Sequence, residues 1–108
     1  MPEKEYKLHA TEMFEKKFDK LIPADKKEDM RRRIAKLKCF PYSGKPLGYK
    51  YFRELKLGKF RVYYEIFEQE IFILLLTISD KKNQQETIDI IKGQREEIRE
   101  YIKNLNLR

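Results

Sequence analysis

Alternating apolar and polar positions mark residues 52–68, where two strand-like runs lie on either side of a Gly58–Lys59 pair. A glycine in such a pair is typical of a tight hairpin turn, and folding the chain there places Lys56 opposite Arg61. Because successive side chains of a strand point to opposite faces, the hairpin has an apolar face and a polar face. The apolar face carries Leu55, Leu57, Phe60, Val62, Tyr64 and Ile66. The polar face carries Glu54, Lys56, Arg61 and Tyr63. We expect the first face to belong to the core and the second to form an open, basic surface on a rigid sheet.

The pattern before this hairpin predicts one strand and two helices. Residues 5–9 alternate as a short strand, and Thr11 is placed to cap the helix that follows. Pro23 ends that helix, and a second helix is expected over residues 25–38, since apolar residues recur at helical spacing in both. Residues 40–48 contain two prolines and two glycines, which indicates a loop.

Three strands and a closing helix are predicted for the rest of the chain. The strands cover residues 49–57, 59–67 and 70–79. Because the run from 71 to 78 is almost continuously apolar, we expect this last strand to be buried on both faces in the centre of the sheet. The helix covers residues 84–104, and its apolar stripe consists of Ile88, Ile91, Ile98, Ile102 and Leu105.

The order strand, helix, helix, strand, strand, strand, helix predicts an α+β fold in a single domain over residues 1–108. The expected architecture is a small twisted, mainly antiparallel sheet with the helical hairpin on one face and a C-terminal helix.

Positive charge is unevenly distributed along the 108 residues, whose formal net charge is +7. Residues 15–38 hold ten Lys and Arg against five Asp and Glu, and residues 42–61 hold six against one. Residues 83–108 hold five of each, so the excess lies before the closing helix. A localised basic excess of this kind attracts polyanions such as nucleic acids.

Several classes of protein are disfavoured by composition. No apolar run reaches the roughly 18 residues of a membrane-spanning helix, and the N-terminus has no apolar segment typical of a signal peptide. Cys39 is the single cysteine, so an intrachain disulfide is excluded and no His, Cys and Asp cluster has metal-ligand spacing. We therefore expect a cytoplasmic protein without a membrane, metal or cofactor requirement.

Three segments, taken in order, carry a resemblance to a known family: YKLHATEMFEKKFDKL, IAKLKCFPYSGKPLGYKYFRELKLGKFRVYYEI and ILLLTISDKKNQQETIDIIKGQREEIREYI. The second contains a Pro-Gly loop that leads into the hairpin pattern R-E-L-x-x-G-x-x-R-V-x-Y-E. In order and spacing, the chain resembles the RelE/ParE/HigB toxin superfamily over nearly its full length. The K-K-x-Q run before a helix ending in E-Y-I is closer to the HigB-like branch, and the hairpin fits RelE and HigB about equally.

The resemblance implies a ribosome-dependent messenger-RNA endonuclease that a cognate antitoxin neutralises. In RelE-type toxins, basic residues of the sheet bind the RNA backbone and the 2′-hydroxyl attacks the adjacent phosphate. By position, the arginine of the hairpin corresponds to Arg61 and a basic residue of the neighbouring strand to Lys56. The basic residue after the last strand corresponds to Lys81, with Lys82 beside it.

The residue types suit this reaction. The transition state carries extra negative charge on the phosphate, which fixed cations stabilise more than they stabilise the ground state. Arg61 is the best candidate, because its planar fork binds two phosphate oxygens and does not lose its proton. Lys56 and Lys81 would add point charge. Tyr63 shares a face with Arg61 and is placed either to stack on a base or to position a hydroxyl.

A general base is less obvious. Glu54 lies on the same face as Lys56 and Arg61, so it is either the base or the ion-pair partner of one of them. Lys59, Lys82 and Arg53 complete the predicted RNA-binding set, although Arg53 falls on the apolar-face parity and also fits a structural role.

Two alternatives remain open from the sequence. The ParE branch of the superfamily acts on DNA gyrase without cutting nucleic acid, so the chain is alternatively a non-enzymatic gyrase inhibitor. It is also compatible with a decayed toxin that only binds its antitoxin. The expected partners are an acidic antitoxin and, for the endonuclease, the ribosome and messenger RNA.

Overall fold

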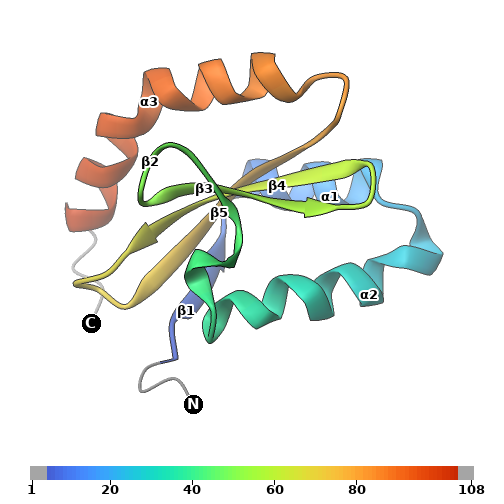
Figure 1. Ribbon diagram of the computed structural model, residues 1–108, viewed down its shortest axis with the longest axis horizontal. Helices are drawn as coiled ribbons and strands as arrows, with labels where there is room; N and C mark the ends of the chain where they lie inside the picture. The colour runs from blue at the N-terminus through green and yellow to red at the C-terminus, as the bar shows by residue number, and fades with distance from the viewer. Residues whose placement is uncertain (1–4, 105–108) are drawn as a thin grey trace.

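Five strands and three α-helices form an α+β fold in residues 5–104, the part of the chain that the computed structural model describes (Figure 1). The elements are β1 (Lys7–Ala10), α1 (Glu12–Leu21), α2 (Ala24–Ala35), β2 (Lys45–Tyr49), β3 (Phe52–Leu57), β4 (Phe60–Phe67), β5 (Phe72–Asp80) and α3 (Gln84–Asn104). Two short 3-10 turns, η1 (Lys36–Lys38) and η2 (Pro41–Ser43), connect α2 to β2. The predicted fold class is confirmed, and α3 has the bounds expected from the sequence.

The sheet is mixed, with strand order β1-β5-β4-β3-β2. β1 runs parallel to β5, and the other neighbouring strands are antiparallel. In the hairpin of β3 and β4, Lys56 lies opposite Arg61 and Leu57 opposite Phe60, which confirms the predicted register. β5 is buried from Phe72 to Ser79, as expected for a strand covered on both faces, but the middle strand is β4.

The helical hairpin of α1 and α2 covers one face of this sheet (Figure 1). Thr11 caps α1 as predicted, because its hydroxyl accepts a hydrogen bond from the N–H of Phe14 at 3.0 Å. The same hydroxyl donates to the carbonyl of Leu76 at 2.7 Å and so fixes the start of α1 to β5. The core on this face consists of Tyr6, Phe14, Phe18, Ile22, Met30, Ile34, Leu37, Leu57, Phe60, Val62, Tyr64, Ile66, Ile73, Leu75 and Ile78.

The opposite face lies under α3, and the expectation of an open polar surface there is wrong for much of it (Figure 1). Apolar residues of α3 pack on apolar residues of the sheet, and together they form a second core. This core consists of Phe52, Tyr63, Phe67, Phe72, Leu74, Leu76, Ile88, Ile91 and Ile102. The stripe of isoleucines along α3 signals this packing, but a stripe does not say which face of the sheet it covers. The predicted stripe residue Leu105 lies outside the described residues.

The sequence prediction missed β2, which takes up residues 45–48 of the expected loop at residues 40–48 and ends one residue later. Pro46 and Gly48 lower the strand propensity of this segment, but an edge strand tolerates proline because one of its sides has no hydrogen-bonding neighbour. The strand predicted to begin at residue 49 starts instead at Phe52, because Lys50 and Tyr51 form the turn between β2 and β3. None of the helices in residues 5–104 is long and apolar enough to cross a membrane.

Candidate functional site

Arg61 is a buried guanidinium near the turn of the β3–β4 hairpin, with only 5% of the residue exposed. Its Nη1 donates to the carbonyl oxygens of Gly58 at 3.0 Å and Phe60 at 3.1 Å. No carboxylate of residues 5–104 forms an ion pair with it. Arginine is seldom buried to this extent without a counter-charge, so an anionic ligand would suit this cation. Hydrogen bonds to the described residues occupy only Nη1, which leaves Nε and Nη2 for that ligand.

Lys56 and Arg61 lie side by side, because directly opposite residues of a hairpin point to the same face. Lys56 is exposed, whereas Arg61 is flanked by Lys56 on β3 and by Ser79 on β5. The prediction that both share one face is confirmed. The prediction that both stand on an open surface is correct for Lys56 and wrong for Arg61, whose head group is drawn back to the carbonyls of its own turn.

The loop after β5 brings further lysines to the same end of the sheet. The backbone N–H of Lys81 donates to the carbonyl of Lys59 at 3.1 Å, which joins this loop to the hairpin turn. Asp80 braces the loop by accepting a hydrogen bond from the N–H of Asn83 at 2.9 Å. Lys59, Lys81 and Lys82 are all exposed. The structure therefore gathers these three predicted residues into a basic rim around Arg61 and Lys56.

Glu54 lies two residues before Lys56 on the same face, and only 6% of it is exposed. Its Oε1 accepts a hydrogen bond from Nε2 of Gln84, the first residue of α3. The alternative in which Glu54 pairs with Lys56 or Arg61 finds no support among the ion pairs of the described chain. Sequence analysis missed Gln84, because the contact depends on where the start of α3 meets the sheet.

Tyr63 is fully buried beneath α3, so the expectation that its ring stacks on a base is wrong. Its hydroxyl shares a hydrogen bond with Oγ of Ser79 at 2.8 Å. Burial raises the pKa of Tyr63 above 10.0, with the Ser79 hydrogen bond acting in the opposite direction. Tyr63 therefore packs the floor of the site.

Arg53 points to the other face of the sheet, where it lies opposite Tyr64. Its guanidinium donates to the carbonyl oxygens of Lys50 at 2.8 Å and Tyr42 at 2.9 Å and also to that of Gly44. The guanidinium also lies 4.9 Å from the centre of the Tyr42 ring. This arrangement fixes the loop before β2, so Arg53 does not join the predicted RNA-binding residues at the hairpin turn.

A second charged cluster lies on the α3 side of the sheet, at the end of β4 away from Arg61. Glu65 is completely buried, and its Oε2 accepts a hydrogen bond from Arg99 while Arg95 lies 3.5 Å away. Burial raises the pKa of Glu65 above its ordinary value of 4.5, although Arg99 and Arg95 lower it in part. Both arginines belong to α3, so this cluster fastens the helix to β4.

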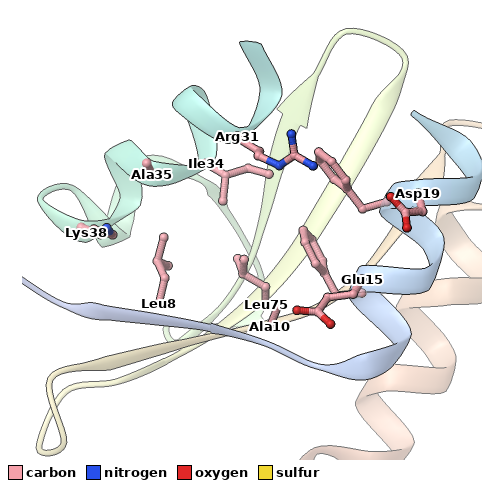
Figure 2. A pocket seen from close by; sticks show the side chains of 11 residues that line it. Leu8, Ala10, Glu15, Asp19, Arg31, Ile34, Ala35, Lys38 and Leu75 are labelled. Carbon is pink, nitrogen blue, oxygen red and sulfur yellow. The ribbon is translucent and has the colours of Figure 1, made fainter. Parts of the chain in front are cut away.

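Metal chemistry has no evident support in residues 5–104, where no group of three or more His, Cys, Asp or Glu side chains is placed to hold an ion. A hollow of about 520 Å³ lies on the other side of the sheet, between β1, α1 and α2 (Figure 2). Leu8 and Leu75 line it from the sheet and Ile34 lines it from α2, and acidic residues of α1 face Arg31 across it. It is separate from the cations at the hairpin turn.

The family model described as the ParE toxin of the type II toxin–antitoxin system parDE matches residues 8–85. The chain belongs to this family. It is therefore a toxin of a type II toxin–antitoxin system, within the RelE/ParE superfamily expected from the sequence. No curated protein matches the chain.

Solved structures of RelE toxins share the fold at low sequence identity. A double arginine-to-alanine mutant of Escherichia coli RelE in the free state is 15% identical, with a TM-score of 0.69 over 84% of this chain and 97% of that one. The RelBE2 toxin–antitoxin complex of Mycobacterium tuberculosis contains a chain 20% identical, with a TM-score of 0.59 over 70% of this chain and 98% of that one. A chain of the intact E. coli RelBE complex is 15% identical, with a TM-score of 0.61 over 69% of this chain and 95% of that one.

Proposed function

We propose that this toxin cuts messenger RNA on the ribosome, with the scissile phosphate bound at Arg61. The observation that carries the proposal is the buried guanidinium of Arg61, which has two nitrogens left for a ligand and no carboxylate partner in the described chain. Lys56 beside it and the rim formed by Lys59, Lys81 and Lys82 make the surroundings strongly cationic. A phosphodiester supplies the missing negative charge, and the fork of an arginine matches two phosphate oxygens.

The proposed reaction is the one that the family resemblance implies, and side chains of the site have the types that it needs. The 2′-oxygen of the preceding nucleotide attacks phosphorus, the bond from phosphorus to the 5′-oxygen breaks, and a 2′,3′-cyclic phosphate remains. Glu54 takes the proton of the 2′-hydroxyl, held in position by the Gln84 amide. Arg61 and Lys56 stabilise the charge that develops on the phosphate oxygens, and Lys81 adds positive charge near the leaving 5′-oxygen, which takes a proton from water and becomes a 5′-hydroxyl. The ribosome would hold the RNA in the conformation for in-line attack.

Cleavage of messenger RNA on programmed ribosomes tests this proposal. The wild-type chain should cut the message and leave 2′,3′-cyclic phosphate and 5′-hydroxyl ends, and Arg61→Ala should lower the rate by about 10²–10³-fold. Lys26→Ala is a matched control, since it removes an exposed positive charge on α2, across the sheet from the site. Cleavage that persists unchanged in Arg61→Ala would contradict the assignment of the site.

Gyrase inhibition is the second candidate, and the match to the ParE family model favours it. Under this alternative the chain blocks DNA supercoiling by purified gyrase and leaves messages intact. The two activities are separated by running supercoiling and ribosome assays on the same preparation. A chain inactive in both assays that still binds its antitoxin would be a decayed toxin.

The proposed partner is an acidic antitoxin. Type II systems pair a toxin with a protein inhibitor, and the relatives named above include solved complexes of this kind. A net charge of +7 favours an acidic partner, and exposed apolar side chains such as Met13 and Ile90 offer it apolar area to bury. Co-purification with the product of a small acidic reading frame next to this gene, together with loss of toxicity on co-expression, tests the pairing.

A further inference from the structure

An exposed tyrosine forms part of a second cationic cluster on the α3 side of the sheet. Tyr49, the last residue of β2, remains 44% exposed, and the Arg95 guanidinium lies 4.1 Å from the centre of its ring. Lys92, one turn earlier on α3, reaches the backbone beside it: a Cβ on Gly48 would lie 3.1 Å from the Lys92 Nζ. Gly48 also has a φ of +90°, a conformation that favours glycine. Any other residue here would strain the backbone and place its Cβ close to the Lys92 ammonium.

The charges of this cluster are only partly neutralised. Arg95 lies 3.5 Å from the buried carboxylate of Glu65, which offsets part of its charge. Lys92 is exposed and forms no ion pair with any residue between 5 and 104. The result is a half-exposed aromatic ring with a guanidinium over one face and an unneutralised ammonium next to it. A base would stack on the opposite face of the ring, and rings flanked by cations bind single-stranded nucleic acid in this way.

Tyr49 lies on the same face of the sheet as the proposed phosphate site. It is opposite Phe52, whose side chain packs under α3, and Lys56 follows Phe52 by four residues on β3. At a rise of about 3.3 Å per residue, these two positions are separated by about 13 Å along the strand. Lys45 lies between them, exposed on β2 and directly opposite Glu54. Cations thus continue from Arg61 and Lys56 through Lys45 to Lys92.

We propose that Tyr49 stacks on a base of the RNA strand whose scissile phosphate occupies Arg61, with Lys92 beside a neighbouring phosphate. This inference rests on the proposed function. It assigns to the edge of β2 a positioning role, in which the ring holds the message a few nucleotides from the cut and takes no part in the chemistry. Stacking tolerates any base, so this contact sets the register of the strand without selecting a codon.

Single-turnover cleavage on programmed ribosomes tests this contact with three variants. Tyr49→Ala should raise the toxin concentration for half-maximal rate by roughly 5- to 150-fold, the range expected for loss of one stacked base, while the maximal rate stays the same. Tyr49→Phe, which keeps the ring, should match the wild-type chain. Phe40→Ala is the matched control, because Phe40 is 60% exposed and lies in the loop after α2.

The RNA side of the contact is tested with messages that carry one abasic nucleotide, moved one position at a time from the cut. At one position the abasic message should weaken the wild-type toxin as much as Tyr49→Ala does, and should not weaken Tyr49→Ala further. Wild-type kinetics in Tyr49→Ala, while the wild-type chain cleaves, would overturn this inference and leave the proposed function standing. The inference would also be overturned if Tyr49→Ala weakened the toxin by the same factor on every abasic message as on the intact message. The Tyr49 ring would then contact ribosomal RNA or protein and not a base of the message. If the wild-type chain cuts no message, the proposed function fails, and this inference with it.

Discussion

Arg61 and Glu65 lie toward the two ends of the same face of one strand, and they differ in whether the described chain supplies an oppositely charged partner. Both belong to β4, both point toward the α3 side, and both are buried, at 5% and 0% exposed. Two arginines of α3 contact Glu65, whereas within residues 5–104 the Arg61 guanidinium donates hydrogen bonds only to the carbonyl oxygens of its own turn. The first charge is neutralised within the chain and holds a helix in place. The second lacks a counter-charge in the described structure, and for this reason we propose it as the phosphate site.

Glu65→Ala should have the largest effect of the changes that test this comparison. It leaves Arg95 and Arg99 facing the sheet without their carboxylate, and breaking a buried ion pair from one side typically costs about 3–5 kcal/mol. We expect a loss near 3 kcal/mol in the free energy of unfolding, since both arginines keep some exposure. Urea unfolding followed by circular dichroism measures it. A loss below about 1 kcal/mol would show that the cluster contributes little to the docking of α3.

Arg61→Lys should separate geometry from charge at the other end. The lysine retains the positive charge but cannot bind two phosphate oxygens at once, and a hydrogen bond to a charged group contributes about 1.5–3 kcal/mol. We therefore expect ribosome-dependent cleavage to slow by roughly 10- to 150-fold, with little change in stability because no ion pair is lost. Single-turnover rates and urea unfolding of the same preparation test both parts. Equal rates for Arg61→Lys and the wild-type chain would show that charge alone is used.

Gln84→Ala should have a smaller effect, because it removes one hydrogen bond from an uncharged amide and leaves the Glu54 carboxylate itself in place. The typical contribution of such a bond is about 1 kcal/mol, so the cleavage rate should fall roughly five- to tenfold. If Gln84 positions the base, Glu54→Gln should slow the reaction further, and adding Gln84→Ala to Glu54→Gln should change little. Additive losses in the double variant would indicate that the two side chains act independently.

The pH dependence of stability sharpens the assignment at Glu65. Burial raises the pKa of Glu65 above 4.5 in the folded chain, so the folded state holds the proton of this carboxyl more tightly than the unfolded state does. Its contribution to stability is therefore greatest below about pH 4.5 and is lost as the pH rises through the raised pKa. Glu65→Gln should remove this component of the pH profile, measured as the difference between the two urea-unfolding series. The assignment would be contradicted if the wild-type chain became more stable relative to Glu65→Gln as the pH rises.

Most of the fold could be predicted from patterns among residues close together in sequence. The alternation in β3 and β4 predicted the pair Lys56 and Arg61, and the Thr11 cap and the bounds of α3 also followed from residues close together in sequence. The edge strand β2 did not follow, because Pro46 and Gly48 oppose a strand and only its pairing with β3 stabilises it.

The candidate site was harder to predict, because it depends on which face α3 covers. The sequence shows that α3 is amphipathic, and that property is satisfied on either side of the sheet. Once α3 lies on the polar face, Tyr63 becomes part of a core and Glu54 gains Gln84 as a partner. Sequence spacing alone does not reveal contacts of this kind between elements far apart in the chain.

Tyr63→Phe should have the smallest effect, and it tests the position between Arg61 and Glu65 on β4. Tyr63 lies between Arg61 and Glu65 on the same face. Among the described residues its hydroxyl bonds only Ser79, whose own hydroxyl donates to the carbonyl of Asp80 at 2.9 Å. Because the ring stays packed and Ser79 keeps a partner, we expect a loss of no more than about 1 kcal/mol in stability and less than a threefold change in cleavage rate. Urea unfolding and single-turnover cleavage measure the two. If the rate fell a hundredfold while stability held, the hydroxyl would act on the substrate, and the polar end of this face would extend from Arg61 to the middle of β4.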